Sequence, residues 1–213
     1  MIINYPHMPT GAVATLADLE RIVAFCREHS ILLLNDNPYG FIRNNQPISL
    51  LQIEGAKDIA MELNSLSKSH NMAGWRIGML AASEQRITEI LRFKSNMDSG
   101  MFLPLQLAAA TALSLGDEWY SSQNEEYYRR ESIGKAIFDL LGLEYAENQA
   151  GLFLWGRLPE GENCYDFCDR LLYDKGIFLT PGGIFGSEGN RYMRLSLCAP
   201  QEVLENVLNI LKL

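Results

Sequence analysis

Lys68 and Arg76 are the residues of this sequence whose types and spacing point most directly to chemistry. Lys68 ends the stretch Ser65-Leu66-Ser67-Lys68, and Arg76 follows it by eight residues. A lysine amine can condense with an aldehyde, while serine hydroxyls and the planar cation of an arginine suit a phosphate group. The spacing therefore indicates a site for a phosphorylated aldehyde.

Strands are expected directly before the candidate residues. Apolar runs at residues 2–4, 31–34 and 59–63 have the length of strands, and the second and third stop just before Asp36 and Ser65. Strands that alternate with helical segments suggest a largely parallel sheet, in which ligands bind at the carboxyl ends of the strands. The loops that follow the three runs are therefore expected to face one cavity.

Helical patterns surround these runs and then dominate the middle of the chain. The first expected helix is capped by Thr15 and continues to about His29, because apolar residues recur there at helical spacing. A further apolar run at residues 77–82 follows the arginine, and the pattern from Glu84 to about Leu143 is helical.

The last part of the chain contains both strand-like and helix-like apolar patterns. Strands are expected near residues 153–155, 177–179 and 192–197, and helices near residues 165–173 and from residue 200 onward. We place a domain boundary inside the long helical stretch, so that residues 1–117 form one domain and residues 118–213 form a second, α+β domain.

Composition indicates a globular protein. The chain has 213 residues, of which 47% are apolar and 21% are charged, and no apolar run has the length of a membrane span. No export signal follows Met1, so a cytoplasmic location is the default expectation.

The charge and the reactive side chains narrow the choice of partners. A net charge of −8 argues against a nucleic-acid partner, because such proteins usually present a basic face, and it favours a small-molecule ligand. Among the four cysteines only Cys164 and Cys168 are close together, with no histidine nearby, so no metal site is expected. None of the three histidines lies in a nucleophile–base pattern, so hydrolase chemistry has little support.

Five stretches of the chain carry recognisable short motifs in a fixed order. They read N-Y-P-H-M-P-T-G at residues 4–11, D-N-P-Y from Asp36 to Tyr39, S-L-S-K ahead of Arg76, G-L-F-L-W at residues 151–155, and P-G-G-I-F-G at residues 181–186 ahead of Arg194. Together they resemble the motifs of the class I and II aminotransferases, the fold-type I, pyridoxal-phosphate-dependent family that includes the aspartate aminotransferases. The resemblance spans nearly the whole chain. It implies an α/β fold, namely the remainder of a mostly parallel three-layer large domain followed by a small C-terminal α+β domain.

The resemblance also implies which residues handle the ring and the aldehyde of pyridoxal 5'-phosphate. Lys68 would bond covalently to the aldehyde carbon and later move the α-proton of the substrate as a base. Asp36 would face the pyridine nitrogen and favour its protonated form, and Tyr39 would donate a hydrogen bond to the phenolate oxygen.

Other matching residues are implied to hold the phosphate and the substrate. Ser65 and Arg76 would contact the phosphate, and Ser67 would either contact it or support the residues that do. Arg194 would grip the α-carboxylate of the substrate with two parallel hydrogen bonds, which a lysine cannot reproduce. The implied reaction moves an amino group between an amino acid and a 2-oxo acid, and the implied assembly is a homodimer.

Two departures from the family pattern stand out. Met8 occupies the place of an asparagine that hydrogen-bonds the phenolic oxygen of the cofactor, and a thioether cannot donate such a bond. The family's chains also carry a long portion before the first motif, whereas this chain begins only a few residues ahead of it. The chain therefore resembles the C-terminal part of an aminotransferase, and by itself it is expected to bind the cofactor weakly or not at all.

Two other functions stay open at this point. Some transcription regulators contain an aminotransferase-like ligand-sensing domain behind a basic DNA-binding segment, and no such segment is present in these 213 residues. The second alternative is a catalytically inactive fragment that takes part only in interactions.

Overall fold

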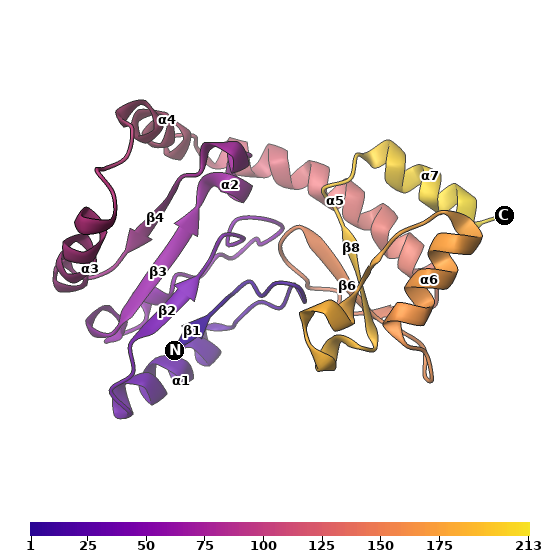
Figure 1. Ribbon diagram of the computed structural model, residues 1–213, viewed down its shortest axis with the longest axis horizontal. Coiled ribbons are helices and arrows are strands. Elements are labelled where there is room, and N and C mark those ends of the chain that lie inside the picture. The colour runs from indigo at the N-terminus through magenta and orange to yellow at the C-terminus, as the bar shows by residue number, and fades with distance from the viewer. The chain divides into compact units, whose positions relative to one another are not determined.

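The computed structural model describes all residues from 1 to 213 and divides into two compact units, each with a four-stranded sheet (Figure 1). The first unit consists of Met1–Pro6 and Val13–Tyr120, and the second consists of His7–Ala12 and Ser121–Leu213. The mixed α/β class expected from the sequence is confirmed. The domain boundary after residue 117 stays a prediction.

The sheet of the first unit is parallel except for its last strand. Its order is β1-β2-β3-β4, formed by Ile2–Ile3, Leu33–Asp36, Ala60–Ser65 and Gly78–Ala81. The first three strands run parallel, and β4 runs antiparallel to β3. Only the one-turn helix α2 (Leu66–Ser69) and a 3₁₀ turn (Ala73–Trp75) join β3 to β4, and a parallel return would need a longer crossover.

Helix α1 (Leu16–Glu28) begins where the sequence predicts, and its inner face supplies much of the core of the first unit. Leu19, Val23 and Cys26 are buried at helical spacing against β2 and the loops around it. Thr15 caps the helix with a reciprocal pair of bonds: its hydroxyl oxygen accepts from the Asp18 N–H at 3.1 Å, and the Asp18 carboxylate accepts from the Thr15 N–H at 3.0 Å. The hydrogen bonds from Thr15, with a smaller contribution from the Arg21 guanidinium, lower the pKa of Asp18 to about 2.

Thr15→Ala is expected to lower the free energy of unfolding by about 1 kcal/mol, the usual cost of removing such a cap. Urea denaturation checks this, and NMR titration should show the pKa of Asp18 moving up toward its ordinary value. Ser83→Ala is the matched control, because Ser83 precedes helix α3 (Glu84–Met97) without forming a side-chain cap bond. Equal effects of the two substitutions would contradict the capping role.

Two further helices follow β4 in the first unit. Helix α3 has no buried residue, and helix α4 (Leu103–Leu113) buries only Ala109. Ala109 joins a small apolar cluster with Leu66, the first residue of α2, and with Met72 and Ile77, which follow α2. The cluster fixes the segment that carries Lys68 from its apolar side.

The second unit is an antiparallel sheet covered by three helices. The sheet order is β5-β6-β8-β7, formed by Glu144–Tyr145, Phe153–Arg157, Tyr192–Ser196 and Thr180–Pro181. The helices are α5 (Asp117–Leu140, of which Ser121 onward belongs to this unit), α6 (Cys164–Lys175) and α7 (Gln201–Leu211). The core is apolar and includes Phe138, Leu154 and Met193, which are fully buried.

The strand expected at residues 177–179 is wrong, because β7 begins only at Thr180. Ile177 and Leu179 are buried, so their apolar character reflects packing in the core rather than pairing in the sheet. No helix in the structure has both the length and the apolarity needed to cross a membrane.

Candidate functional site

Asp36 and Ser65 leave the first sheet at the same edge. Each is the last residue of its strand, and the strands β2 and β3 are parallel neighbours in which Asp36 lies opposite Leu63. Asp36 is exposed, and its carboxylate forms no hydrogen bond or ion pair within the chain. The carboxyl edge of this sheet therefore presents an acid at the end of β2 and, two residues past its partner on β3, a hydroxyl.

The loop after β2 is fixed to the strands on both sides of it. The Asn4 side chain, which follows β1, donates to the Asp36 carbonyl at 2.5 Å. On the other side the Asn37 N–H donates to the Leu63 carbonyl at 2.9 Å, and the Asn64 side chain donates to the Asn37 carbonyl at 3.1 Å. These bonds make the position of the Asp36 backbone independent of its own side chain.

Lys68 lies on α2, the single helical turn that continues directly from β3. The Ser65 hydroxyl caps this turn by accepting from the Ser67 N–H at 3.2 Å. The Lys68 side chain is half-buried, and its amine forms no hydrogen bond or ion pair within the chain. The hydroxyl of Ser67 also forms none, so an amine and a hydroxyl on the same turn have their bonding capacity available.

Arg76 returns to the same edge because β4 is antiparallel. Gly78, the first residue of β4, pairs with Ser65, and Arg76 precedes it by two residues. A Cβ on Gly78 would lie 2.6 Å from the Asn64 carbonyl oxygen, so only glycine permits this approach of the strands. Arg76 adopts a left-handed backbone with φ 51°, which is costly for a residue other than glycine. Its exposed guanidinium donates to the Ala73 carbonyl at 2.9 Å.

Tyr39 lies in the loop after β2, where it is buried.

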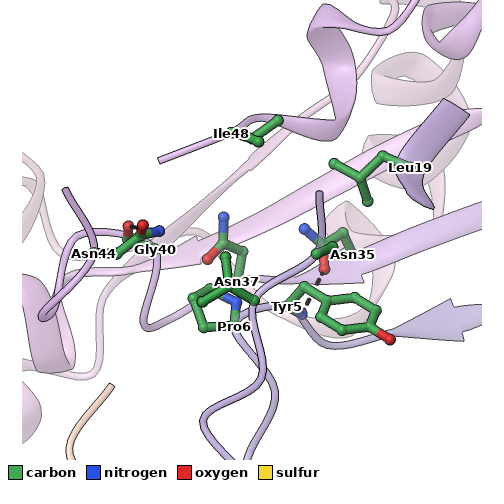
Figure 2. Close-up of a pocket in the computed structure, with 10 residues that line it drawn as sticks. Tyr5, Pro6, Leu19, Asn35, Asn37, Gly40, Asn44 and Ile48 are labelled. Atoms are coloured by element: carbon green, nitrogen blue, oxygen red, sulfur yellow. Dashed lines mark hydrogen bonds between the residues drawn. The ribbon is translucent and has the colours of Figure 1, made fainter. Parts of the chain in front are cut away.

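A small cavity beside this loop is drawn in Figure 2, which also shows the Tyr5 N–H donating to the Asn35 side-chain oxygen at 3.1 Å. The cavity measures about 10 Å³ and so has room for at most about one water. It is not a ligand site.

A larger cavity of about 260 Å³ lies over one face of β3 and β4. Its lining comes from the loop after β2 and from alternate residues of the two strands, among them Asn37, Glu62, Asn64, Met79 and Ala81. None of the predicted site residues lines it. The predicted residues instead gather on the exposed edge of the sheet.

Glu62 is a buried carboxylate that the motif pattern did not single out. It accepts hydrogen bonds from the Leu50 N–H at 2.7 Å, from the Ser49 hydroxyl at 3.1 Å and from the Asn37 side chain at 3.2 Å. These bonds connect the two ends of the 37–50 loop, next to Asp36, through Glu62. In the sequence, Glu62 could be noticed only as a charged residue within the apolar run of β3, and that observation identifies no partner.

Arg194 belongs to the second unit, where two aromatic rings hold its guanidinium. The central carbon lies 4.2 Å from the ring centre of Phe153 and 4.6 Å from that of Phe185. Phe153 comes from β6 and Phe185 from the 3₁₀ turn after β7, while Arg194 lies on β8, the strand between β6 and β7. Stacking of this kind fixes the plane of the cation, and that plane determines where it can bind a carboxylate.

Met8 also contacts Arg194. Its sulfur lies 3.7 Å from Nη1 of the guanidinium. The segment His7–Ala12 is attached to the second unit through Gly11, whose carbonyl accepts from the Ala150 N–H at 2.8 Å. Gly11 has φ +70°, and a Cβ there would lie 2.8 Å from the Gln149 side chain, so glycine is required. The residue that departs from the family pattern is thus a neighbour of the predicted carboxylate-binding arginine.

The structure therefore brings Asp36, Ser65, Ser67, Lys68 and Arg76 to one edge of the first sheet. Tyr39 follows in the loop after Asp36. Arg194 lies in the second unit, where it contacts the rings of Phe153 and Phe185. Together the edge residues offer a carboxylate, an amine, a guanidinium and two hydroxyls. A ligand with an aldehyde, a basic ring nitrogen and a phosphate would use each of them.

Comparison with known proteins extends over almost all of the chain. The model of the family "Aminotransferase class I and II" matches residues 1–211. The LL-diaminopimelate aminotransferase of Oleidesulfovibrio alaskensis is 36% identical over 98% of this chain and 55% of its own length. That of Dehalococcoides mccartyi is 41% identical over 95% of this chain and 53% of its own length. The chain thus spans about half the length of these curated relatives.

Solved structures give the same picture. BacF from Bacillus subtilis superimposes with a TM-score of 0.89 at 36% identity, over 100% of this chain and 55% of that protein. A probable N-succinyldiaminopimelate aminotransferase from Thermus thermophilus superimposes with a TM-score of 0.89 at 33% identity, over 99% of this chain and 57% of that protein. Because the family model covers nearly every residue, the chain belongs to the class I and II aminotransferases.

Proposed function

We propose that the whole protein is a pyridoxal-phosphate-dependent aminotransferase and that Lys68 is its catalytic lysine. The single observation that carries the proposal is the Lys68 amine. It has no partner within the chain, and it stands on a capped turn at the sheet edge that also presents Asp36 and Arg76. Members of this family use pyridoxal 5'-phosphate and act on amino acids and 2-oxo acids.

The side chains at the edge fit the cofactor group by group. Asp36 would hold a proton on the ring nitrogen, since a carboxylate there favours the charged ring, and Tyr39 would donate to the phenolic oxygen. Ser65, Ser67 and Arg76 would hold the phosphate, the arginine through charge-assisted bonds. The left-handed backbone of Arg76 supports this role, because strain of this kind tends to be kept where a side chain must point in one direction.

Bound pyridoxal phosphate supplies a ring that takes up the electron pair left when the α-proton of an amino acid is removed. The protein's own part is binding and proton transfer. Lys68 Nζ would hold the cofactor covalently until a substrate amine replaces it, and the freed amine would then take the proton from the substrate Cα as a general base. Arg194 would bind the substrate by its α-carboxylate and so fix its orientation.

The amino donor we propose first is LL-diaminopimelate, because the curated relatives described above carry that activity in their names. We also infer a homodimer, which is typical of aminotransferases. A cytoplasmic location stays a prediction from the sequence.

The experiment uses the whole protein with pyridoxal phosphate, LL-diaminopimelate and 2-oxoglutarate, and it measures the glutamate formed. The expected result is cofactor-dependent glutamate formation that is absent without a donor. Other amino acids, tested one at a time, define the substrate range. A protein that binds pyridoxal phosphate but transfers no amino group from any donor would contradict the proposal.

Met8→Asn is expected to lower KM for the amino donor by about three- to tenfold, the value of one net hydrogen bond. An amide N–H would then stand beside Arg194, where the thioether donates nothing. Steady-state kinetics measure the effect. Met8→Leu, which keeps the volume without adding a donor, is the control and should behave like the native protein. If both variants changed KM alike, the substrate carboxylate would not bind next to Met8.

A further inference from the structure

We propose that Ser69, His70 and Trp119 are positioning residues, which act on the cofactor site by fixing the one-turn helix that carries Lys68. The inference rests on the proposed role of Lys68. The amine itself has no partner within the chain, so within this unit its placement starts from the backbone of α2. A helix of four residues is not stable by itself, because nearly all of its carbonyls lack a hydrogen-bond partner inside the helix.

The C-terminal end of α2 is held by two hydrogen bonds from side chains. The Trp119 indole N–H donates to the Ser69 carbonyl at 2.9 Å, although the two residues are 50 positions apart in the sequence. The Ser69 hydroxyl donates to the Ser65 carbonyl at 3.1 Å and so joins the last residue of the turn to its cap. Lys68 lies between these two points.

His70 completes the arrangement from a buried position. Its Nδ1 lies 2.9 Å from the Ser69 hydroxyl oxygen, and the two residues are only 5% and 2% exposed. The single hydroxyl hydrogen of Ser69 is directed to Ser65, whose carbonyl can only accept. The Ser69 hydroxyl lies within hydrogen-bond distance of both the Ser65 carbonyl and the imidazole, so it links the turn to His70. On the other side of the ring, the Tyr120 hydroxyl lies 3.4 Å from Nε2.

Aromatic contacts fix the imidazole ring in this orientation. The Trp119 ring is stacked on it with centroids 6.2 Å apart and an interplanar angle of 9°, and the Tyr120 ring meets it edge-on at 5.5 Å. Phe41 is stacked on Tyr120 at 4.8 Å. Trp119 and Tyr120 belong to the first turn of α5, so the start of that helix is attached to the turn that carries Lys68.

Burial favours the neutral form of His70. Burial lowers the pKa of His70, and the backbone carbonyl of Ala112 opposes that effect in part. The other polar groups at the ring are Ser69 and Tyr120, whose own pKa is raised by burial and by Asp117. The folded-state pKa is thus below the unfolded value of 6.5, so the stabilisation is complete above pH 6.5 and is lost as the pH falls through the lowered pKa.

Amide hydrogen exchange of residues 65–72, measured without cofactor, tests the network directly. His70→Asn keeps a side-chain amide, which can donate or accept, close to the position of Nδ1, whereas His70→Gln moves the amide toward the position of Nε2. We expect His70→Gln and Ser69→Ala to speed exchange in this segment by about tenfold and His70→Asn to leave it nearly unchanged. Equal exchange in the asparagine and glutamine variants would overturn the inference, as would an unchanged rate in Ser69→Ala.

The second readout is the rate at which pyridoxal phosphate, trapped by borohydride, labels Lys68 in the whole protein. His70→Gln should slow this labelling by about tenfold, His70→Asn should restore it, and labelling of the exposed Lys57 should not change. If Lys68 were labelled at the same rate in His70→Gln as in the native protein, the positioning role would be overturned. If Lys68 is not labelled even in the native protein, the proposed function fails, and the exchange experiment still decides whether the network holds the turn.

Discussion

Replacing Lys68 by alanine is expected to reduce kcat of the whole protein by at least about 10⁴-fold, the upper range for the loss of a positioned general base. The effect should reach this size because the same amine would serve twice, first as the covalent anchor of the cofactor and then as the base for the α-proton. Turnover with a saturating amino donor and 2-oxo acid measures it. Added small amines should restore part of the rate, since they can replace a missing base but not its precise placement.

Lys57→Ala is the control for this experiment. Lys57 is an exposed lysine of the same unit, in the 3₁₀ turn before β3, and its removal should leave kcat within experimental error. A Lys68→Ala protein that is folded and keeps more than about a hundredth of native turnover would exclude Lys68 as the base.

Arg194→Lys is expected to raise KM for every amino donor by about tenfold to a hundredfold, with a smaller effect on kcat. The reason is geometric. Phe153 and Phe185 stack on the Arg194 guanidinium, which is planar and can form two parallel hydrogen bonds to a carboxylate. A lysine ammonium is not planar and cannot form this parallel pair. The increase should be similar for donors with different side chains, because they share only the α-carboxylate.

Arg191→Lys is the matched control, because Arg191 lies three residues earlier and donates to the Leu158 and Pro159 carbonyls instead. It should alter stability slightly and KM not at all. If Arg194→Lys raised KM for some donors and not for others, the arginine would be reading a side chain rather than the common carboxylate.

Much of the fold could be predicted because local sequence and burial agree. Thr15 as a helix cap, the apolar spacing of α1 and the aliphatic run of β2 each give one consistent signal, and the structure confirms α1 and its cap. Residues 177–179 show where apolar character misleads. Ile177 and Leu179 read as a strand because they are apolar, but they are buried beside the sheet without pairing in it. In a short segment, a residue that is buried without pairing and a residue of a paired strand are both apolar, so the sequence does not distinguish them.

The site could be predicted only in part, for a related reason. Motif spacing and strand ends are local features, and the structure places Asp36, Ser65 and Lys68 where these features suggested. Contacts between distant residues leave no such trace. The Met8–Arg194 contact joins residues 186 positions apart, and the Trp119–Ser69 bond joins residues 50 positions apart. No spacing rule connects either pair.

The most direct test of the central claim is to locate the lysine that binds the cofactor. The native protein would be incubated with pyridoxal phosphate, reduced with borohydride, digested and examined by mass spectrometry. We predict a label on Lys68 and none on exposed lysines such as Lys57 or Lys175. A label spread evenly over exposed lysines, or absent from Lys68, would contradict the assignment of this sheet edge as the cofactor site.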